Sequence, residues 1–271
     1  MNKDKRLNLL KIELNRLYNR YNRREFIHPD PLEFLYHYDD IYDREIVAII
    51  ASSLAYGKVS QILKSISSVL KHISPPSLFL KKASLKSLNR TFYDFKHRFT
   101  KGEELAILLF GVKKIIEKYG SLKNCFIDKL SPNDDTIFPA LSKFIDELIF
   151  YSNGKYNSLI PSPKKGSALK RLNLFMRWMV RKDEVDPGGW EDIPKSMLII
   201  PLDTHMHKIS LLLGLTKRKQ ADLKTAFEIT KAFKGIAPGD PVKYDFALTR
   251  LGIREEINTD HSIKDFIMQR A

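Results

Sequence analysis

The sequence contains a single cysteine, Cys125, and this scarcity excludes several kinds of site. One thiol cannot form an internal disulfide, and it cannot supply the ligands of a multi-cysteine zinc or iron–sulfur centre. A catalytic thiol is not expected either, since the sequence around Cys125 offers no general base. We therefore expect a reducing, cytoplasmic setting and no cofactor.

Long apolar runs and phosphate-binding motifs are also missing. No run approaches the ~18–20 apolar residues of a membrane-spanning helix, so no membrane association is expected. The polar start Met1–Arg6 does not suggest a secretory signal. There is no G-x-G-x-x-G, no P-loop and no convincing period-two alternation. These absences argue against a membrane protein and against a nucleotide-binding α/β fold.

Basic residues are abundant. The 271 residues carry 46 Lys plus Arg against 32 Asp plus Glu, a formal net charge of +14. A chain of this length forms one large domain or two small ones. The positive surplus favours a polyanionic partner, above all a nucleic acid, although a lysine-rich composition alone has other origins.

Helical periodicity runs through most of the chain and predicts an all-α fold. Glycines, prolines and capping side chains punctuate the pattern at many of its breaks. Between two of the predicted helices lies an aromatic and basic stretch, residues 90–99. The predicted helices span residues 6–22, 44–56, 59–73, 79–88, 103–119, 138–151, 170–181, 209–213, 217–234 and 242–251.

The segment that begins at Lys170 has two faces. One is apolar at helical spacing and is expected to pack on the core. The other is polar and mostly cationic, and it consists of Lys170, Asn173, Arg177 and Arg181. Two interpretations of this stripe stay open: an ordinary solvated helix face, or a track for nucleic-acid phosphates.

Lys170 and Asp203 are the strongest candidates for chemistry. Asp203 follows Pro201 and opens an apolar helix, a position typical of an N-cap. Lys170 would lie at the positive end of a helix dipole, which favours the neutral, nucleophilic amine. A lysine paired with a carboxylate suits attack at C1′ of a deoxynucleotide, because the carboxylate stabilises the developing oxocarbenium ion.

Several motifs carry a family resemblance. Pro201–Met206 resembles the P-V-D-x-H/R motif of the helix–hairpin–helix (HhH-GPD) DNA glycosylases, in which the aspartate is catalytic. Ile50–Lys58 is similar to the helix and turn that approach the lesion in that superfamily, and Lys170–Phe175 is most similar to its archaeal 8-oxoguanine (GO) glycosylase branch. An uncharacterised bacterial family, distantly related to this superfamily, is similar over residues 171–181, 185–190 and 241–248.

The resemblance implies a fold, an activity and a partner. It implies two helical subdomains with a cleft between them: residues 44–171, and residues 1–43 plus 172–271. Lys170 would be the Schiff-base nucleophile and Asp203 the catalytic carboxylate of a bifunctional glycosylase and AP lyase in base excision repair. The implied substrate is 8-oxoguanine in double-stranded DNA, handled by a monomeric, cytoplasmic, nucleoid-associated enzyme without a metal or other cofactor.

The chain departs from the family pattern in three respects that matter. The usual hairpin G-V-G-x-K is replaced by Pro163–Ser167, so Lys164 or Lys165 is an alternative nucleophile. The asparagine-rich turn beside the lesion is replaced by Leu54–Tyr56, so the base specificity does not carry over. The cysteines that hold an iron–sulfur cluster in one branch are absent, which excludes that cluster.

Further residues have expected roles in binding. Ser53, Tyr56 and Trp190 are candidates for the extruded base, since flipped bases are stacked between aromatic side chains, although Tyr56 and Trp190 have core packing as the alternative. His205 and His207 do not form a metal site, because residues i and i+2 of a helix do not face each other. The residues expected at the DNA backbone are Lys165, Gly166, Ser167, Arg171, Arg177, Arg181 and His205.

Two other functions remain open. A helical DNA- or RNA-binding protein without catalysis would bind nucleic acid in a salt-sensitive way, and Lys170→Ala would only weaken that binding. A glycosylase that uses water instead of lysine would remove a different lesion without forming an imine.

Overall fold

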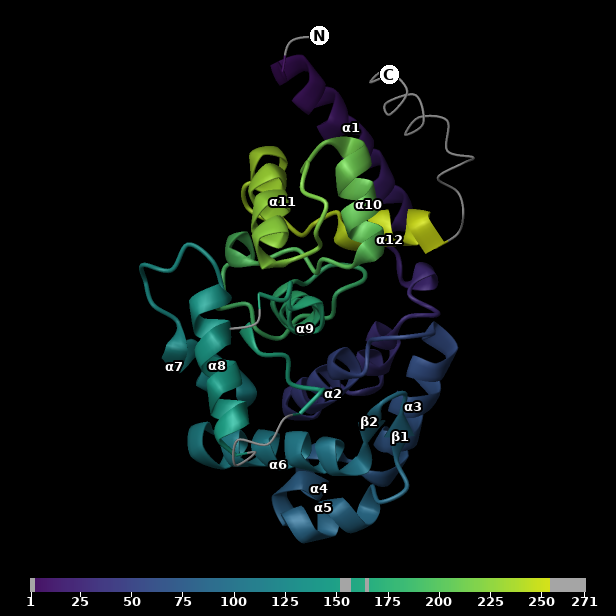
Figure 1. Ribbon diagram of the computed structural model, residues 1–271, viewed down its shortest axis with the longest axis vertical. Coiled ribbons are helices and arrows are strands. Elements are labelled where there is room, and N and C mark those ends of the chain that lie inside the picture. The colour runs from purple at the N-terminus through teal and green to yellow at the C-terminus, as the bar shows by residue number, and fades with distance from the viewer. Residues whose placement is uncertain (1–2, 152–156, 164–165, 254–271) are drawn as a thin grey trace.

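Helices form most of the computed structural model, which describes residues 3–151, 157–163 and 166–253 (Figure 1). The first part of the chain contains α1 (Lys3–Tyr21), η1 (Arg24–Phe26), η2 (Pro31–His37), α2 (Ile41–Ser53), α3 (Val59–His72), α4 (Pro76–Lys82), α5 (Leu85–Thr91), β1 (Lys96–His97), β2 (Thr100–Lys101), α6 (Gly102–Tyr119), α7 (Leu122–Lys129) and α8 (Phe138–Phe150). The second part contains α9 (Lys170–Val180), η4 (Lys195–Met197), α10 (Thr204–Leu213), α11 (Leu223–Ile236) and α12 (Asp245–Ile253). The predicted helical character is confirmed.

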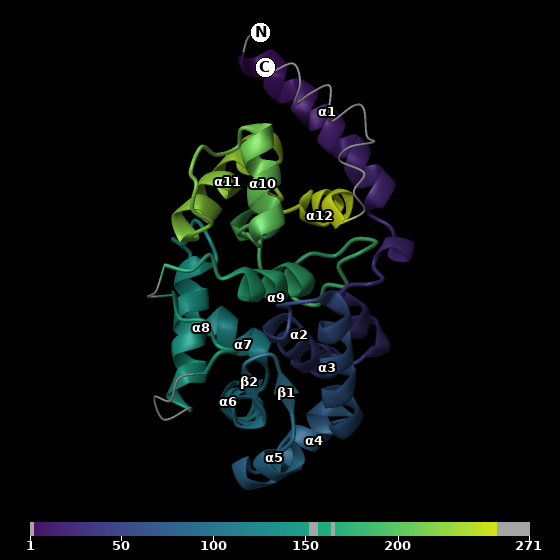
Figure 2. The same ribbon diagram turned by 45° about the vertical axis from the view of Figure 1, so that its right-hand side comes forward.

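The helices gather in two groups with α9 between them (Figure 2). Helices α2 to α8 lie on one side of α9, and α1, α10, α11 and α12 lie on the other. Helix α9 packs against α2, while α12 contacts both α1 and α10. The expected subdomain boundaries at residues 44 and 171 stay a prediction, and η2, which precedes the first boundary, packs against α2. Helix α9 is thus the central element of the molecule.

Helix α2 is buried along its length from Glu45 to Ser53, as its apolar composition predicts. Its N-cap is Asp40, whose carboxylate accepts hydrogen bonds from the amides of Tyr42 and Asp43 at 2.9 and 3.0 Å. The helix predicted from residue 44 thus begins earlier, at Ile41, and Asp43, which would cap a helix that starts at residue 44, lies inside the first turn. Its carboxylate instead accepts a hydrogen bond from the amide of Ser77 at the start of α4, at 2.7 Å. Asp43 therefore joins two helices.

Two predicted helices begin or break elsewhere. The single helix expected over 79–88 is two helices, because Ser84 and Ser87 form a capping box that starts α5. The helix expected to start after Thr216 begins at Leu223 instead. Asp222 caps it by accepting a hydrogen bond from the amide of Thr225 at 2.8 Å. Local side-chain hydrogen bonds decide both boundaries.

A short antiparallel hairpin interrupts the helices before α6. Strand β1 pairs with β2, and His97 lies opposite Thr100. Arg98 and Phe99 form the turn, and Arg98 has a positive φ of 55°. Strands of two residues are too short to show an alternating pattern in the sequence. Within the described ranges, no helix is both long and apolar enough to cross a bilayer.

Candidate functional site

Lys170 and Asp203 meet in the folded chain. Lys170 is the first residue of α9, and Asp203 is the N-cap of α10. The distance from Lys170 Nζ to Asp203 Oδ2 is 3.4 Å, and the two side chains are 33% and 28% exposed. The pair is thus close enough to exchange a proton through a small movement and open enough to meet a substrate.

Asp203 divides its two carboxylate oxygens between two tasks. Oδ1 accepts a hydrogen bond from the backbone amide of Met206 at 2.9 Å, as an N-cap does. Oδ2 faces Lys170. Leu202, on the N-terminal side, and Met206, in the first turn, are both buried. The structural role of Asp203 therefore fixes its position and leaves one oxygen free to act on Lys170.

The backbone just before Lys170 is held in an unusual conformation. Leu169 has a positive φ of 51°, which a bulky residue rarely adopts, and its side chain is buried. Its amide donates to Ser167 Oγ at 3.3 Å. Residues held in such conformations concentrate at functional sites, where the surrounding structure maintains them. The buried side chain of Leu169 thus holds the backbone in place where α9 begins.

Arg171 connects α9 to the end of α2. Its guanidinium donates to the carbonyl oxygens of Ser53 and Ser158 at 2.8 and 2.7 Å, and it lies 5.1 Å from the centre of the Tyr56 ring. Ser53 is buried, and its carbonyl oxygen, not its hydroxyl, makes this contact. The segment expected to approach the lesion therefore does lie beside Lys170. Arg171 itself is not a surface phosphate ligand, because it bonds internally.

The loop expected to contact the DNA backbone lies between α9 and the start of α11. Gly166 and Ser167 are exposed. The Gly166 carbonyl oxygen accepts a hydrogen bond from the amide of Leu223 at 3.0 Å, and Ser167 pairs with Asp222 in an isolated β-bridge. His205 is exposed in the first turn of α10. Lys164 and Lys165 lie outside the described residues.

Arg177 and Arg181 are placed differently from the expectation. Both guanidinium groups are buried, so they form neither a solvated face nor an accessible phosphate track. Both contact Asp186; Arg177 Nη2 lies 2.8 Å from its Oδ1. Arg177 also pairs with Asp245, and Arg181 Nε lies 3.0 Å from Asp240 Oδ2. These arginines hold the segments after α9 together.

Trp190 is a core residue, so its expected place against an extruded base is wrong. It is fully buried, and its ring centre lies 5.1 Å from that of Phe175 and 5.9 Å from that of Phe126. Its Nε1 donates to Glu45 Oε1 at 2.8 Å. Glu45 also accepts a hydrogen bond from the amide of Leu122 at 2.9 Å. The sequence signal for this junction was a carboxylate, Glu45, that directly precedes the apolar run Ile46–Ala51.

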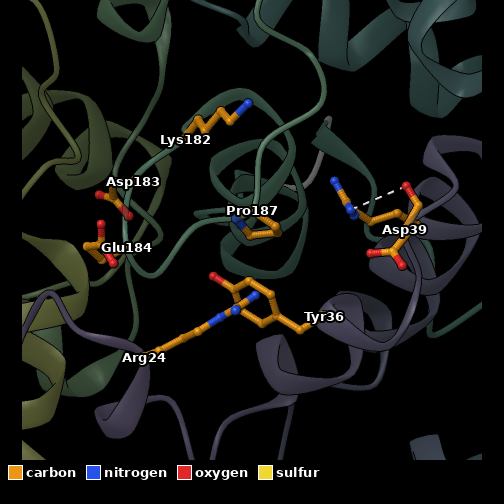
Figure 3. A pocket seen from close by; sticks show the side chains of 8 residues that line it. Arg24, Tyr36, Asp39, Lys182, Asp183, Glu184 and Pro187 are labelled. Atoms are coloured by element: carbon orange, nitrogen blue, oxygen red, sulfur yellow. Dashed lines mark hydrogen bonds between the residues drawn. The ribbon is translucent and has the colours of Figure 1, made fainter.

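A hollow of about 270 Å³ lies beside the loop after α9 (Figure 3). Arg24 lies 3.9 Å from the centre of the Tyr36 ring, and Arg44 Nη2 lies 3.5 Å from the carbonyl oxygen of Asp39. The carboxylate of Asp183 accepts hydrogen bonds from two backbone amides at 2.8 Å. Since these charged groups bond to the protein itself, we interpret the hollow as a junction between segments.

Neither a clustered metal site nor a reactive thiol stands out in the described part of the chain. No group of three or more His, Cys, Asp or Glu side chains there could hold a metal ion. Cys125 is buried, and burial raises the pKa of its thiol to about 12. A thiol with such a pKa is a poor nucleophile at neutral pH.

Comparison with known protein families identifies the family of this chain. The family described as "Protein of unknown function (DUF2400)" matches residues 30–254, most of the sequence, and the chain therefore belongs to that family. No curated protein and no solved structure matches it.

Proposed function

We propose that the protein is a DNA base-excision glycosylase with AP lyase activity, in which Lys170 is the nucleophile and Asp203 the assisting carboxylate. The observation that carries the proposal is the accessible pair itself, with Lys170 Nζ 3.4 Å from Asp203 Oδ2. The partner is duplex DNA that contains a damaged base, with 8-oxoguanine as the first substrate to test. The net charge of +14 supports a polyanionic partner.

The proposed reaction uses both side chains. The target nucleotide leaves the base stack, and the neutral amine of Lys170 attacks C1′ as the bond from C1′ to the base nitrogen breaks. The base leaves with the electrons of that bond, and Asp203 stabilises the positive charge on the sugar. The new amine nitrogen loses a proton, which Asp203 Oδ2 can accept. Opening of the sugar ring then gives an imine, and β-elimination expels the 3′ phosphate.

Borohydride trapping tests this proposal. The reagent reduces the imine to a stable amine, so protein and DNA become covalently joined. We expect an adduct on duplexes that carry 8-oxoguanine, no adduct on undamaged duplexes, and no adduct with Lys170→Ala. Asp203→Asn should slow adduct formation by about 10²-fold or more, the range for loss of one electrostatic stabiliser.

The other outcomes discriminate between the remaining functions. An adduct on abasic DNA alone would support the lyase and require another lesion as substrate. Base release without an adduct would indicate a water-using glycosylase. No adduct and no base release, with salt-sensitive DNA binding intact, would contradict the proposal and favour a binding protein.

A further inference from the structure

The β1–β2 hairpin presents an exposed aromatic ring next to unpaired positive charge. Phe99 is 64% exposed at the turn, although most large apolar side chains of the described chain are buried. The neighbouring residue Arg98, together with Lys58, Gln61 and Lys96, lines a surface hollow of about 520 Å³. This lining contains three positive charges and no carboxylate.

These three cations have no partner within the described residues. Neither an ion pair nor a side-chain hydrogen bond joins Lys58, Lys96 or Arg98 to another described side chain. Arg98 instead packs along Gly57, where an added Cβ would lie 2.7 Å from Arg98 Cδ. Gly57 has a positive φ of 99° and thereby gives the guanidinium its place at the hollow. The hollow thus has the charge of an anion site, and a phosphate is the anion that suits arginine and lysine together.

Hydrogen bonds from Tyr56 and Ser65 hold the hairpin against the rest of the protein. The hydroxyl of Tyr56 donates to the carbonyl oxygen of His97 at 3.1 Å or to Thr100 Oγ1 at 2.5 Å. The imidazole of His97 bonds Ser65 Oγ through Nδ1 at 2.9 Å and the Tyr56 carbonyl oxygen through Nε2 at 3.1 Å. The ring of Tyr56 stacks on that of Phe99, with centres 5.1 Å apart and planes at 27°. Phe99 is therefore a supported platform and not a loose side chain.

A chain of contacts joins this platform to the candidate catalytic pair. Phe99 stacks on Tyr56, and the guanidinium of Arg171 lies 5.1 Å from the centre of the Tyr56 ring. Arg171 directly follows Lys170. The two residues with positive φ that are not glycine, within the described ranges, are Arg98 at the hairpin turn and Leu169 before Lys170. Strained backbone thus occurs at both ends of this chain of contacts.

We propose that the hairpin is a second DNA-binding site, which holds one unpaired nucleotide of a single strand. Its base stacks on Phe99, and its phosphate enters the hollow between Lys58, Lys96 and Arg98. An aromatic platform beside a basic groove is how proteins bind single strands without reading their sequence. The base must be unpaired, because a ring face is free for stacking only outside the duplex. The proposal takes DNA as the polyanion from the proposed function, but it does not depend on the chemistry of Lys170.

Binding measurements with two oligomers separate base stacking from charge. One is a fluorescein-labelled oligodeoxythymidine, and the other is a sugar–phosphate chain of the same length without bases. Phe99→Ala should weaken binding of the first by about tenfold or more and leave binding of the second unchanged. Phe150→Ala, at an exposed phenylalanine on α8, is the matched control and should change neither.

Charge variants test the hollow in the same assay. Lys58→Gln combined with Lys96→Gln should weaken binding of both oligomers and lower the salt dependence, d log K/d log [salt], by about 1.4 in magnitude. The matched control is Lys224→Gln with Lys231→Gln, two exposed lysines on α11. The control pair should leave the salt dependence unchanged.

A fluorescent variant reports stacking directly. Both native tryptophans, Trp178 and Trp190, are buried, so the tryptophan of Phe99→Trp is the exposed fluorophore. Its emission should fall when oligodeoxythymidine binds and should not change with the baseless chain. Equal loss of binding in Phe99→Ala and Phe150→Ala, or equal quenching by both oligomers, would overturn the proposal. Tighter binding of an RNA strand or of polyglutamate at the same residues would overturn the assignment to DNA.

Lys170→Ala separates this inference from the proposed function. The variant should keep the dependence of oligodeoxythymidine binding on Phe99, because Lys170 lies outside the hollow. Absence of a borohydride adduct from the wild-type protein, with Phe99-dependent binding intact, would contradict the lyase alone. A wild-type adduct that is lost in Lys170→Ala, together with no effect of Phe99→Ala on single-strand binding, would contradict the hairpin site alone.

Discussion

Basic side chains at both ends of α9 pair with aspartates, but the pair at one end is exposed to solvent and the pairs at the other end are buried. At the N-terminal end, Lys170 makes one contact of 3.4 Å with Asp203, and both side chains are about a third exposed. At the C-terminal end, Arg177 and Arg181 share the fully buried Asp186 and contact further aspartates. One helix thus carries an open ion pair at its start and a closed network at its end.

The difference indicates which charges serve the fold. An ion pair that water reaches contributes little to stability, about 0–1 kcal/mol, because the solvent screens it. A buried charge that loses its partner is strongly destabilising, because the remaining charge has neither water nor a counter-ion. The network around Asp186 is therefore expected to hold the structure together, while Lys170 and Asp203 are available for chemistry.

The largest effect on stability is expected for Arg177→Ala. The substitution leaves Asp186 and Asp245 buried with less compensation, and it should lower the free energy of unfolding by about 3–5 kcal/mol. Urea denaturation followed by circular dichroism measures this change. A loss below about 1 kcal/mol would show that the two ends of α9 do not differ as described.

A pH-dependent effect on stability is expected at Glu45. This carboxyl is buried like Asp186, but hydrogen bonds and not a close ion pair stabilise its charge. Burial raises its pKa from 4.5 to about 7, against the opposing effect of hydrogen bonds from Trp190 and two backbone amides. The folded state then binds the proton more tightly than the unfolded state. The stabilisation is complete below pH 4.5 and is lost as the pH rises through about 7.

The variant Glu45→Gln isolates this titration. The free energy of unfolding of the wild type, relative to the variant, should fall by roughly 3 kcal/mol between the two limits of pH. Urea denaturation of both proteins across that range gives the difference. Parallel pH profiles would mean that Glu45 does not titrate between pH 4.5 and 7.

The smallest effect on stability is expected for Lys170→Ala. Since the pair with Asp203 is partly exposed, the substitution should change the free energy of unfolding by less than about 1 kcal/mol. The same urea experiment measures it, with Arg177→Ala as the contrasting variant. A loss comparable to that of Arg177→Ala would assign Lys170 to the structural framework.

The sequence predicts the open pair better than the buried network. Lys170 and Asp203 each mark the start of a helix, and helix starts leave local signals in the sequence. The partners of Arg177 are different: Asp186 and Asp245 come from a loop and from a distant helix. Spacing along α9 shows that a polar stripe exists, but not whether other segments bring aspartates to cover it.

Dependence on contacts with distant segments also explains why the sequence did not predict the burial of Trp190. A tryptophan behind two glycines occurs both in binding loops and, more often, against a core, and the choice depends on Glu45 and Phe175 in other helices. The aromatic and basic stretch before α6 is visible in the sequence. Its turn is not, because Arg98 adopts a positive φ of 55°, a conformation that residues other than glycine rarely adopt.

Peptide mapping of the borohydride-trapped complex tests the central claim most directly. The wild-type protein is trapped on duplex DNA that carries an abasic site, digested with protease and nuclease, and examined by tandem mass spectrometry. We predict that the sugar remnant is attached to Nζ of Lys170. Attachment to Lys164 or Lys165, or no trapped peptide from a protein that binds the duplex, would contradict the assignment of Lys170 as the nucleophile.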